Sequence, residues 1–422
     1  MARSREPAGE PADESGSGMA GAGTGTIFRG MPSTAPLSLT RLMLRDFRSY
    51  AALTVPFRGR IVVISGENGV GKTNLLEAIS LLGPGRGLRG ARMAELARRE
   101  PEGPLPWAAA GRFLGPWGPF DIGTGTPEGG PLERRSFRLD GAPVRGQADL
   151  AERVAAVWLT PQMDRLFQDG AGDRRRFLDR LAWALEPHHA REVAAYDNAM
   201  AQRNRLLAEE RRGGRADPDW LAALEDAMAR HGVAVAASRR GLVGRLNAVL
   251  AAGITGAFPA ARLELQCPVS AALNGAPALA VEDDLRADWA AGRARDAAAG
   301  ATLIGPHRAD LGFIHAPKDL PAALCSTGEQ KALLVAVVLA HAALIEEARG
   351  FAPLLLLDEV AAHLDAPRRE ALFAALAALP AQTFLTGTDP GIFAPLRGVA
   401  EGFRALPGQL VADMDFPVPE AA

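Results

Sequence analysis

Apolar and polar positions follow different patterns along the chain, and the changes of pattern mark its parts. Residues 1–36 are rich in Gly, Ala, Ser, Pro and Glu and have little apolar periodicity, so we expect a disordered extension, or a true start at Met19 or Met31. An apolar series begins at Leu42, and the run Ile61-Val62-Val63-Ile64 suits a buried strand. Two strands are therefore expected in this part of the chain.

The middle of the chain has helical periodicity. Between about residues 163 and 297, Ala, Leu and Arg recur at helical spacing, with Pro and Gly mostly at segment ends. Strand patterns return around Thr302, Leu354 and Thr383. The order of sheet, helices and sheet predicts a helical lobe inserted into an α/β domain. We find no sustained heptads, so no long coiled coil is expected.

A β-hairpin is predicted over residues 135–144. Asp140-Gly141 lies between two short strand patterns and supplies turn residues that tolerate positive φ. A loop is the alternative interpretation of this segment.

Length and composition exclude some classes of protein. The 422 residues, 48% of them hydrophobic, can bury a large core in two or three domains or lobes. The longest apolar runs, such as 333–344, are too short for the roughly 20 residues of a membrane span. The N-terminus has no secretory signal pattern, and Cys267 and Cys325 lie far apart in the sequence. We therefore expect the protein to work in the reducing cytoplasm, without a disulfide framework.

Charge gives one useful signal. The net charge of -2 does not support nucleic-acid binding by itself, so any such surface must come from local clusters. Among 47 basic residues only three are lysines, Lys72, Lys318 and Lys331. Because the chain otherwise prefers arginine, each of these three lysines is a candidate for a role that needs an ammonium group.

A P-loop pattern follows the buried strand, with glycines that let backbone N–H groups converge on phosphate oxygens. Lys72 would contact the β and γ phosphates of ATP, Thr73 would hold Mg²⁺, and a helix beginning near Asn74 would add positive potential. A glycine-rich turn without function is the alternative. The residues of the pattern are Gly66, Glu67, Asn68, Gly69, Val70, Gly71, Lys72 and Thr73.

Two acids follow the apolar run 354–357, as a Walker B segment requires. Asp358 would bind Mg²⁺, and Glu359 would act as the general base that polarises the attacking water. A cap for the next helix is the alternative. Glutamate directly after aspartate disfavours a GTPase-type switch.

Residues 326–331 open an apolar helix and resemble the signature motif of ABC-type ATPases. Ser326, Gly328 and Glu329 would form a second anion site, made of a hydroxyl, a backbone N–H and a helix N-terminus. An ordinary serine-capped helix, with Glu329 near its third position, is the alternative.

The resemblance to ABC-type ATPases has consequences for assembly. In this architecture the signature motif completes the site of a partner chain, so two copies would sandwich two ATP molecules in a symmetric homodimer. Asp365 resembles the D-loop residue that couples the two sites. Thr388 follows the strand after which many ABC proteins place a histidine that senses the γ-phosphate, and it is our candidate for that role.

Further motifs resemble the RecF family, within the group that it forms with SMC proteins, over nearly the whole chain from residue 37. In that group the arginine at Arg48 commonly reaches the nucleotide phosphates, and Gln162 would be the Q-loop residue that senses metal and γ-phosphate, although RecF members often have an acid there. His307 and Arg308 could support the nucleotide or DNA face, or be structural. The similar segments are 44–50, 160–164, 173–179, Tyr196 with 202–204, and 305–310.

The resemblance implies an α/β fold, an ABC-type P-loop ATPase head called lobe I, with an inserted helical lobe II and no long coiled coil. The expected parts are the extension 1–36, lobe I with the P-loop at 37–162, lobe II at 163–297, and lobe I with the signature and Walker B segments at 298–422. The resemblance also implies a cytoplasmic protein with weak ATPase activity. ATP and Mg²⁺ would be its cofactors, and ATP hydrolysis would serve as a switch.

The RecF resemblance further implies a mediator of recombinational repair. Such a protein binds double-stranded DNA near single-strand gaps, works with RecO and RecR, and promotes RecA loading and the SOS response. Phosphate contacts would be independent of sequence and sensitive to salt, and few aromatic residues accompany the basic ones, so base stacking is not expected. Three arginine clusters are candidates for these contacts, although each could equally be a solvated surface: Arg86, Arg89 and Arg92; Arg134, Arg135 and Arg138; and Arg174–Arg176.

Two alternatives belong to other functional classes. An ABC transporter energy subunit would share the ATPase motifs, but it should have a shorter helical lobe and a permease partner. A P-loop kinase that phosphorylates a small molecule would share only the phosphate site. DNA binding at low salt would separate the first from a RecF-like protein, and product analysis would separate the second.

Overall fold

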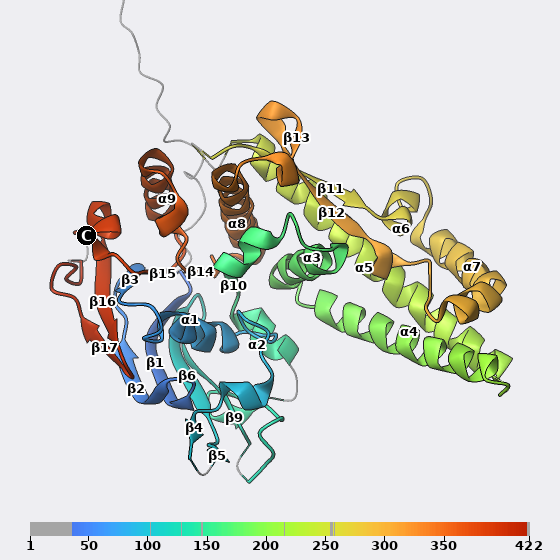
Figure 1. Ribbon diagram of the computed structural model, residues 1–422, viewed down its shortest axis with the longest axis horizontal. Coiled ribbons are helices and arrows are strands. Elements are labelled where there is room, and N and C mark those ends of the chain that lie inside the picture. Colours follow the sequence, from blue (N-terminus) through green and yellow to red (C-terminus); the bar gives the residue numbers. More distant parts are fainter. Residues whose placement is uncertain are drawn as a thin grey trace, which may run out of the picture. The chain divides into compact units, whose positions relative to one another are not determined.

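The β-branched run at 61–64 forms the core of β3 (Ile61–Ser65), a fully buried strand of a six-stranded sheet (Figure 1). The computed structural model describes residues 36–419, except 102, 128, 145–146, 215, 254–255 and 257. The expected N-terminal extension, 1–36, lies outside these residues apart from Pro36.

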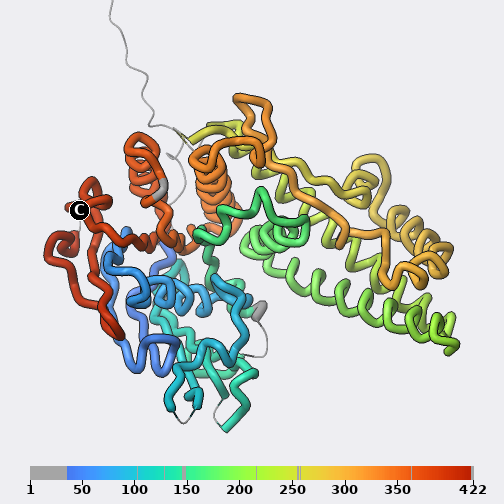
Figure 2. The backbone as a smooth tube through the Cα atoms, viewed as in Figure 1, coloured from blue at the N-terminus to red at the C-terminus, as the bar shows by residue number. Residues whose placement is uncertain are grey.

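The sheet that contains β3 joins segments from distant parts of the sequence. Its order is β10-β14-β15-β3-β16-β17, with parallel neighbours from β10 to β16 and an antiparallel final pair. Figure 2 shows the blue N-terminal segment beside the red C-terminal one, as this pairing requires. Strands predicted around Leu354 and Thr383 are confirmed. The other members are β10 (Ala156–Leu159), β14 (Leu354–Leu357), β15 (Thr383–Gly387), β16 (Ala400–Leu406) and β17 (Gln409–Ala412).

A second six-stranded sheet is antiparallel, in the order β2-β1-β6-β7-β8-β9. The predicted hairpin is confirmed, because β8 and β9 pair around a turn in which Asp140 has φ 50° and Gly141 has φ 80°. A short pair, β4 (Arg99–Glu100) and β5 (Gly103–Pro104), stands apart from it. The strands of the second sheet are β1 (Ser38–Phe47), β2 (Tyr50–Pro56), β6 (Ala108–Gly115), β7 (Gly118–Gly125), β8 (Ser136–Leu139) and β9 (Ala142–Pro143).

Helix α1 (Lys72–Leu81) starts directly after the P-loop residues and contacts both sheets. It touches β1 and β6 of the antiparallel sheet and β15 of the parallel sheet. Leu75, Leu76 and Ile79 are at most 1% exposed, so burial of the helix supplies most of its stability. The core thereby fixes where the first turn of α1 points.

Helices α3–α7 make up most of the middle of the chain, here called the helical region. Helices α4 and α5 pack along each other, and α7 contacts both (Figure 1). Within this region Arg203, which is 0% exposed, binds Glu225 and Asp296 and also reaches Thr302. The helices are α3 (Ala171–Leu185), α4 (His189–Arg211), α5 (Pro218–Ala251), α6 (Pro268–Ala272) and α7 (Ala278–Ala299).

Two details of the sequence prediction for this region need correction. Residues 261–266, expected to be helical, form the strand β11, which pairs with β12 (Asp310–His315), itself paired with β13 (Leu320–Pro321). No strand forms at Thr302, because its hydroxyl is buried and bonds to Arg203 and Asn204. Tertiary hydrogen bonds have overruled a local strand preference there. The boundaries that we drew between lobes stay predictions.

Helix α8 (Thr327–Arg349) contains the apolar segment that was expected to be helical. It ends at Gly350, whose φ of 73° suits a glycine C-cap, and it contacts α3, α5 and β10. Two more helices adjoin strands of the parallel sheet in the sequence. Helix α2 (Gln147–Arg153) precedes β10, and α9 (Ala366–Ala378) lies between β14 and β15. Among the described residues, no helix combines the length and the apolar character that crossing a membrane requires.

Candidate functional site

The P-loop residues connect the buried end of β3 to the first turn of α1. Gly69 and Gly71 have φ values of 83° and 112°, which favour glycine, and a Cβ on Gly71 would lie 2.7 Å from Ser49 Oγ. The loop surface is formed by Glu67, Asn68 and Gly69, which are exposed, and by Val70, which is half-buried. The exposed loop backbone is therefore open to a ligand from one side.

Lys72 is the cation at the centre of this loop. Its side chain is 5% exposed, and Nζ donates to the carbonyl oxygens of Gly66 at 2.7 Å and Glu67 at 2.9 Å. Glu359 Oε1 lies 3.6 Å from the same nitrogen. The P-loop lysine and the second acid after β14 are thus neighbours, as the sequence predicts for one site.

Thr73, Asp358 and Thr386 form a chain of hydrogen bonds below the loop. Thr73 Oγ1 lies 3.1 and 2.9 Å from the two carboxylate oxygens of Asp358, and Thr386 Oγ1 donates to Asp358 Oδ1 at 2.7 Å. Asp358 is 4% exposed and Thr386 is 1% exposed. This is a pair of hard oxygen donors, from a hydroxyl and a carboxylate, as Mg²⁺ prefers.

Sheet order explains why these side chains meet. The parallel strands β3, β15 and β14 are consecutive neighbours, so their carboxyl ends lie at one edge of the sheet. Thr73 follows β3, Thr386 is the fourth residue of β15, and Asp358 follows β14. No group of three or more His, Cys, Asp or Glu residues suited to a metal was found among the described residues. A bound Mg²⁺ would therefore need further oxygens from phosphate or water.

Glu359 occupies an unusual backbone conformation. Its φ is 52°, in the left-handed region, and its backbone N–H donates to Thr386 Oγ1 at 3.0 Å. A non-glycine residue in this region costs on the order of 1–3 kcal/mol and is kept only when its surroundings fix it. Its partly exposed carboxylate is thus directed by the turn that follows β14.

Arg48 is placed beside α1 rather than in the loop. Its guanidinium makes two hydrogen bonds of 2.9 Å to the carboxylate of Glu77, which is 1% exposed. Arg89 also binds Glu77, at 3.2 Å, and reaches Asn74 at 2.8 Å. The phosphate contact expected of Arg48 stays a prediction, and Glu77 competes for this guanidinium.

Gln162 lies near the same sheet edge but on its surface. It is exposed within the short helix η2 (Pro161–Arg165), which follows β10, the strand beside β14. None of the contacts between described residues joins Gln162 to Thr73 or Asp358. Its role toward a metal is therefore still a prediction.

The signature residues form a capping box at the start of α8. Ser326 is the N-cap, its Oγ accepts from the Glu329 backbone N–H at 3.4 Å, and Glu329 Oε2 accepts from Ser326 N at 3.0 Å. Lys318 and Ser326 lower the pKa of the Glu329 carboxyl to about 2. The structure thus shows the capping box that the alternative interpretation describes. A capping box does not prevent the same residues from forming an anion site.

The position of the signature segment matters for that function. Ser326 and Thr327 are exposed and Gly328 is half-buried, and none of the contacts between described residues links them to the P-loop. The exposed serine can be reached by another molecule.

Two weaker candidates have defined positions. Asp365 is the N-cap of α9, where its side chain accepts from Arg368 N at 2.9 Å. Thr388 is exposed directly after β15. The buried hydroxyl that touches both acids belongs to Thr386, two residues earlier. A threonine in an apolar strand is an ordinary strand residue, so no signal in the sequence singles out Thr386.

Several arginines from the predicted clusters are engaged inside the fold. Arg135 donates to the carbonyl oxygens of Leu81 and Gly85, and burial lowers its pKa to about 9. Arg174 pairs with Asp310 at 2.7 Å, and Arg175 donates to the carbonyl oxygen of Ala309 at 2.6 Å. These three guanidinium groups have structural roles.

The histidine expected near the nucleotide or DNA face is also engaged. His307 Nδ1 lies 2.7 Å from Tyr196 Oη, and Nε2 lies 2.9 Å from the carbonyl oxygen of Thr302. Burial lowers its pKa. Both ring nitrogens of His307 are therefore engaged in hydrogen bonds within the protein, whereas the side chain of Arg308 is exposed.

Comparison with known proteins agrees with this geometry. The RecF/RecN/SMC N-terminal domain family model matches residues 38–109. The DNA replication and repair protein RecF of Mesorhizobium japonicum is 50% identical over 368 residues, which cover 87% of this chain and 96% of that protein. The RecF protein of Agrobacterium fabrum is 46% identical over 90% of this chain and 100% of its own length.

A solved structure has the same fold. It is of the recombination mediator protein RecF-ATP in the RecFOR pathway, and it matches with a TM-score of 0.77 at 20% identity, over 90% of this chain and 99% of that one. The expected ABC-type ATPase head with additional helices is thereby confirmed as the fold class. Because the curated relatives exceed 45% identity over most of both chains, this chain belongs to the RecF family of DNA replication and repair proteins.

Proposed function

We propose that this chain binds ATP with Mg²⁺ at the P-loop, hydrolyses it slowly, and uses the ATP-bound state as a switch for DNA binding in recombinational repair. The observation that carries the proposal is the cluster of Thr73 and Asp358 beside Lys72 and Glu359. The solved structure of RecF-ATP, which has the same fold, supports ATP as the ligand here.

The residues present fit this ligand. The buried ammonium of Lys72 now bonds to two loop carbonyls, and phosphate oxygens would be stronger partners for it. Thr73 and Asp358 would hold Mg²⁺, which supplies Lewis acidity and neutralises phosphate charge when it is bound.

Glu359 is the residue that would act on water. The Glu359 carboxylate lies next to Lys72, beside which the terminal phosphate would bind, and the Glu359 backbone N–H is held by Thr386. It would accept the proton of the attacking water as general base. Thr388 and Gln162 are our candidates for sensing the γ-phosphate.

The exposed signature segment supports an ATP-dependent homodimer. Ser326, Gly328 and Glu329 would face the γ-phosphate bound by a second copy, and Asp365 would couple the two sites. Because the ligand would bridge the copies, ATP would favour the dimer by mass action and hydrolysis would release it. The same homodimer is the proposed DNA-binding form.

The finer function follows from the family. We infer binding to double-stranded and gapped DNA, work with RecO and RecR, promotion of RecA loading and SOS induction, and a cytoplasmic location. Of the arginines in the clusters, those exposed and without a described ion pair are the candidates for phosphate contacts: Arg86, Arg92, Arg134 and Arg138. Arg308 is exposed as well. No specific observation favours the transporter or the kinase alternative.

Binding titrations test this proposal. Fluorescence anisotropy would be measured on labelled duplex, single-stranded and gapped DNA, with and without ATP and Mg²⁺, at several salt concentrations. We expect duplex and gapped DNA to bind more tightly with ATP, with an affinity that falls steeply with salt. The variant Lys72→Arg should lose the ATP effect. Equal binding of all DNAs in every condition would contradict the proposal.

A further inference from the structure

A cleft of about 810 Å³ lies away from the P-loop, between the glycine-rich segment 83–90 and the helices α3 and α4. Its lining also includes Trp158 of β10 and Gln162 of η2. This volume lies in the range of roughly 300–1,000 Å³ that is typical of small-molecule sites. Apart from Gln162, a candidate γ-phosphate sensor, the proposed ATPase mechanism uses none of the residues that line this cleft.

The wall formed by β10 and α3 contains a cation without an anion. The Arg180 guanidinium stacks 4.8 Å from the Trp158 ring centroid and 5.2 Å from that of Phe177. Its hydrogen-bond partner among the described residues is the Met163 sulfur, at 3.5 Å, and no described carboxylate lies within ion-pair distance. Burial lowers the pKa of Arg180 to about 10. A guanidinium has five N–H donors, so most of its capacity is available.

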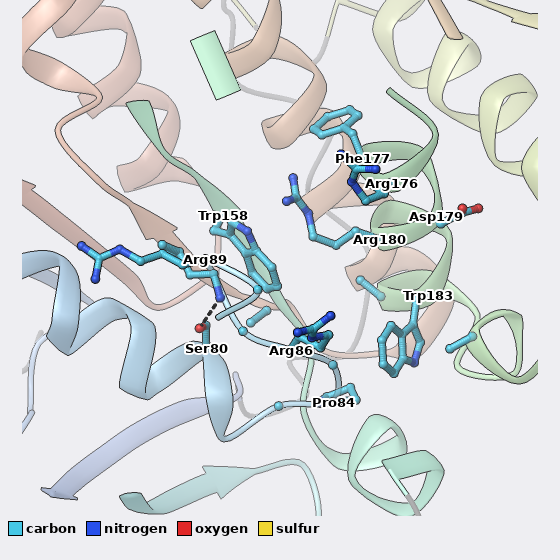
Figure 3. A pocket seen from close by; sticks show the side chains of 18 of the residues that line it. Ser80, Pro84, Arg86, Arg89, Trp158, Arg176, Phe177, Asp179, Arg180 and Trp183 are labelled. Carbon is cyan, nitrogen blue, oxygen red and sulfur yellow. Dashed lines mark hydrogen bonds between the residues drawn. The ribbon is translucent and has the colours of Figure 1, made fainter. Parts of the chain in front are cut away.

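A second donor on this wall also lacks a partner. Trp158 is 7% exposed, and its indole Nε1 is buried without a hydrogen-bond partner in the described structure. Buried polar groups are normally paired, so such an N–H needs an explanation. Figure 3 shows the Arg180 side chain reaching from α3 toward Trp158, whereas Asp179 points the other way. The indole N–H and the Arg180 guanidinium therefore both lack an oxygen acceptor among the described residues.

The acids around the cleft are mostly paired with other residues. Asp179 binds Arg239 and His189, and Asp173 binds Arg176. Asp169 lies 3.7 Å from Arg165. Asp197 on α4 has no described ion pair, and burial raises the pKa of its carboxyl.

Two guanidinium groups and an aromatic wall remain for a ligand. Arg86 is exposed, lines the cleft and has no described ion pair, so it supplies a second free cation. Two cations match a phosphomonoester, with a charge of about -1.5 to -2, better than a carboxylate. The half-buried Trp183 also lines the cleft and packs against Gly85, where a Cβ would lie 3.1 Å from the ring. A flat ring can stack on such a surface.

We propose that this cleft binds a phosphomonoester attached to a planar ring, of the size of a 5′-mononucleotide. The phosphate contacts Arg180, Arg86 and the Trp158 indole N–H, and the ring lies against Trp183. The site is separate from the P-loop and does not depend on ATP hydrolysis.

Calorimetric titration of the full chain with 5′-dAMP tests the site, with deoxyadenosine and inorganic phosphate as separate probes. We expect saturable binding of 5′-dAMP, and weaker binding of either half alone. Arg180→Met and Arg86→Met should each weaken it about tenfold or more, because they remove charge-assisted hydrogen bonds. Trp158→Phe keeps the ring and loses the N–H, so a loss of several-fold is expected.

The controls separate this site from the ATP site and from misfolding. Arg245→Met, an exposed change outside the cleft lining, should leave 5′-dAMP binding unchanged, and Lys72→Ala should retain it. Arg86 is exposed, so Arg86→Met keeps the test valid if Arg180→Met fails to fold. Three results would each overturn the proposal. The first is that 5′-dAMP shows no saturable binding at concentrations up to about 1 mM. The second is that Arg86→Met and Trp158→Phe bind 5′-dAMP as tightly as the wild type, and the third is that Lys72→Ala loses 5′-dAMP binding.

Discussion

Thr386 Oγ1 donates to Asp358 Oδ1 at 2.7 Å and accepts from the backbone N–H of Glu359 at 3.0 Å. One buried hydroxyl on β15 therefore fixes both acids that follow β14. The proposed metal ligand and the proposed base are thus held by a strand that carries neither of them. We expect Thr386 to be a positioning residue.

Replacing Thr386 with valine tests this role. Thr386→Val keeps a β-branched side chain and removes the hydroxyl, so ATP turnover should fall about 10- to 100-fold, as for other residues that orient a metal ligand. The KM for ATP should change less, because Lys72 and the P-loop are intact. Thr383→Val on the same strand is the matched control, because the Thr383 hydroxyl donates to the carbonyl oxygen of Ala381 and contacts neither acid in the described structure. Equal turnover in both variants would show that the Thr386 contact has no catalytic consequence.

An ion pair ties the signature helix to the segment that holds Gln162. Lys331 of α8 is 3% exposed and its Nζ lies 3.3 Å from Asp164 of η2. Lys331→Met leaves the aspartate without its cation. Because the Asp164 side chain is 36% exposed, water screens part of the loss, and we expect destabilisation of about 1–3 kcal/mol.

A double-mutant cycle measures this pair directly. Urea unfolding of Lys331→Met, Asp164→Asn and the double variant gives the coupling energy. We expect the double variant to lose less stability than the sum of the single variants. Strictly additive losses would mean that the ion pair contributes nothing.

His341 makes stability depend on pH. It is 0% exposed on α8, its Nε2 lies 2.9 Å from the carbonyl oxygen of Leu181, and burial lowers its pKa to about 3. The unfolded chain, with a histidine pKa of about 6.5, binds the proton more readily. The stabilisation from the neutral ring is therefore fully present above pH 6.5 and is lost as the pH falls toward 3.

The histidine effect can be isolated with a neutral amide. His341→Gln can still donate to the carbonyl oxygen of Leu181 but does not titrate. Between pH 7 and 5.5 the wild type should lose about 1 kcal/mol more unfolding free energy than His341→Gln. His188→Gln, at an exposed histidine, should keep the wild-type pH dependence. Parallel pH profiles for wild type and His341→Gln would refute the assignment.

Arg203 is the buried cation of the helical region. Its guanidinium bonds to Glu225 and Asp296, which are 2% exposed, and to the carbonyl oxygen of Trp289. Arg203→Met would leave buried charge unpaired, so we expect a loss of about 3–5 kcal/mol. Arg293, which is partly exposed and whose ion pair among the described residues is with Glu225, gives a milder comparison. In chemical denaturation, similar losses for Arg203→Met and Arg293→Met would contradict the central position of Arg203.

The parts of the site that the sequence predicts are those whose residues lie together in one short segment of the chain. The P-loop, the two acids after β14 and the serine that caps α8 each lie in one short segment, and strand and helix preferences place them without other knowledge. The positions of Asp358 and Thr73 beside each other also follow once the strands are parallel. Local signals were sufficient for these residues.

The remainder depends on contacts between distant segments. Glu77 looks like an ordinary helix residue, and its pairing with Arg48 arises only when the β1–β2 turn meets α1. Arg135 belongs to a basic cluster in sequence, yet the fold buries it against carbonyl oxygens. The strand at 261–266 had an alternating pattern that local analysis could have used, whereas Thr302 lost its strand to hydrogen bonds with Arg203.

The central claim is that each copy completes the ATP site of another, and mixing two defective variants tests it. Lys72→Ala should fail because it lacks the P-loop cation, and Ser326→Arg should fail because its signature segment cannot face a partner's phosphate. In a mixed dimer, one site combines both defects and the other has neither. We predict that each variant alone has little ATPase activity and that the mixture regains it. A mixture that stays inactive at every ratio, although both variants are folded, would contradict the claim.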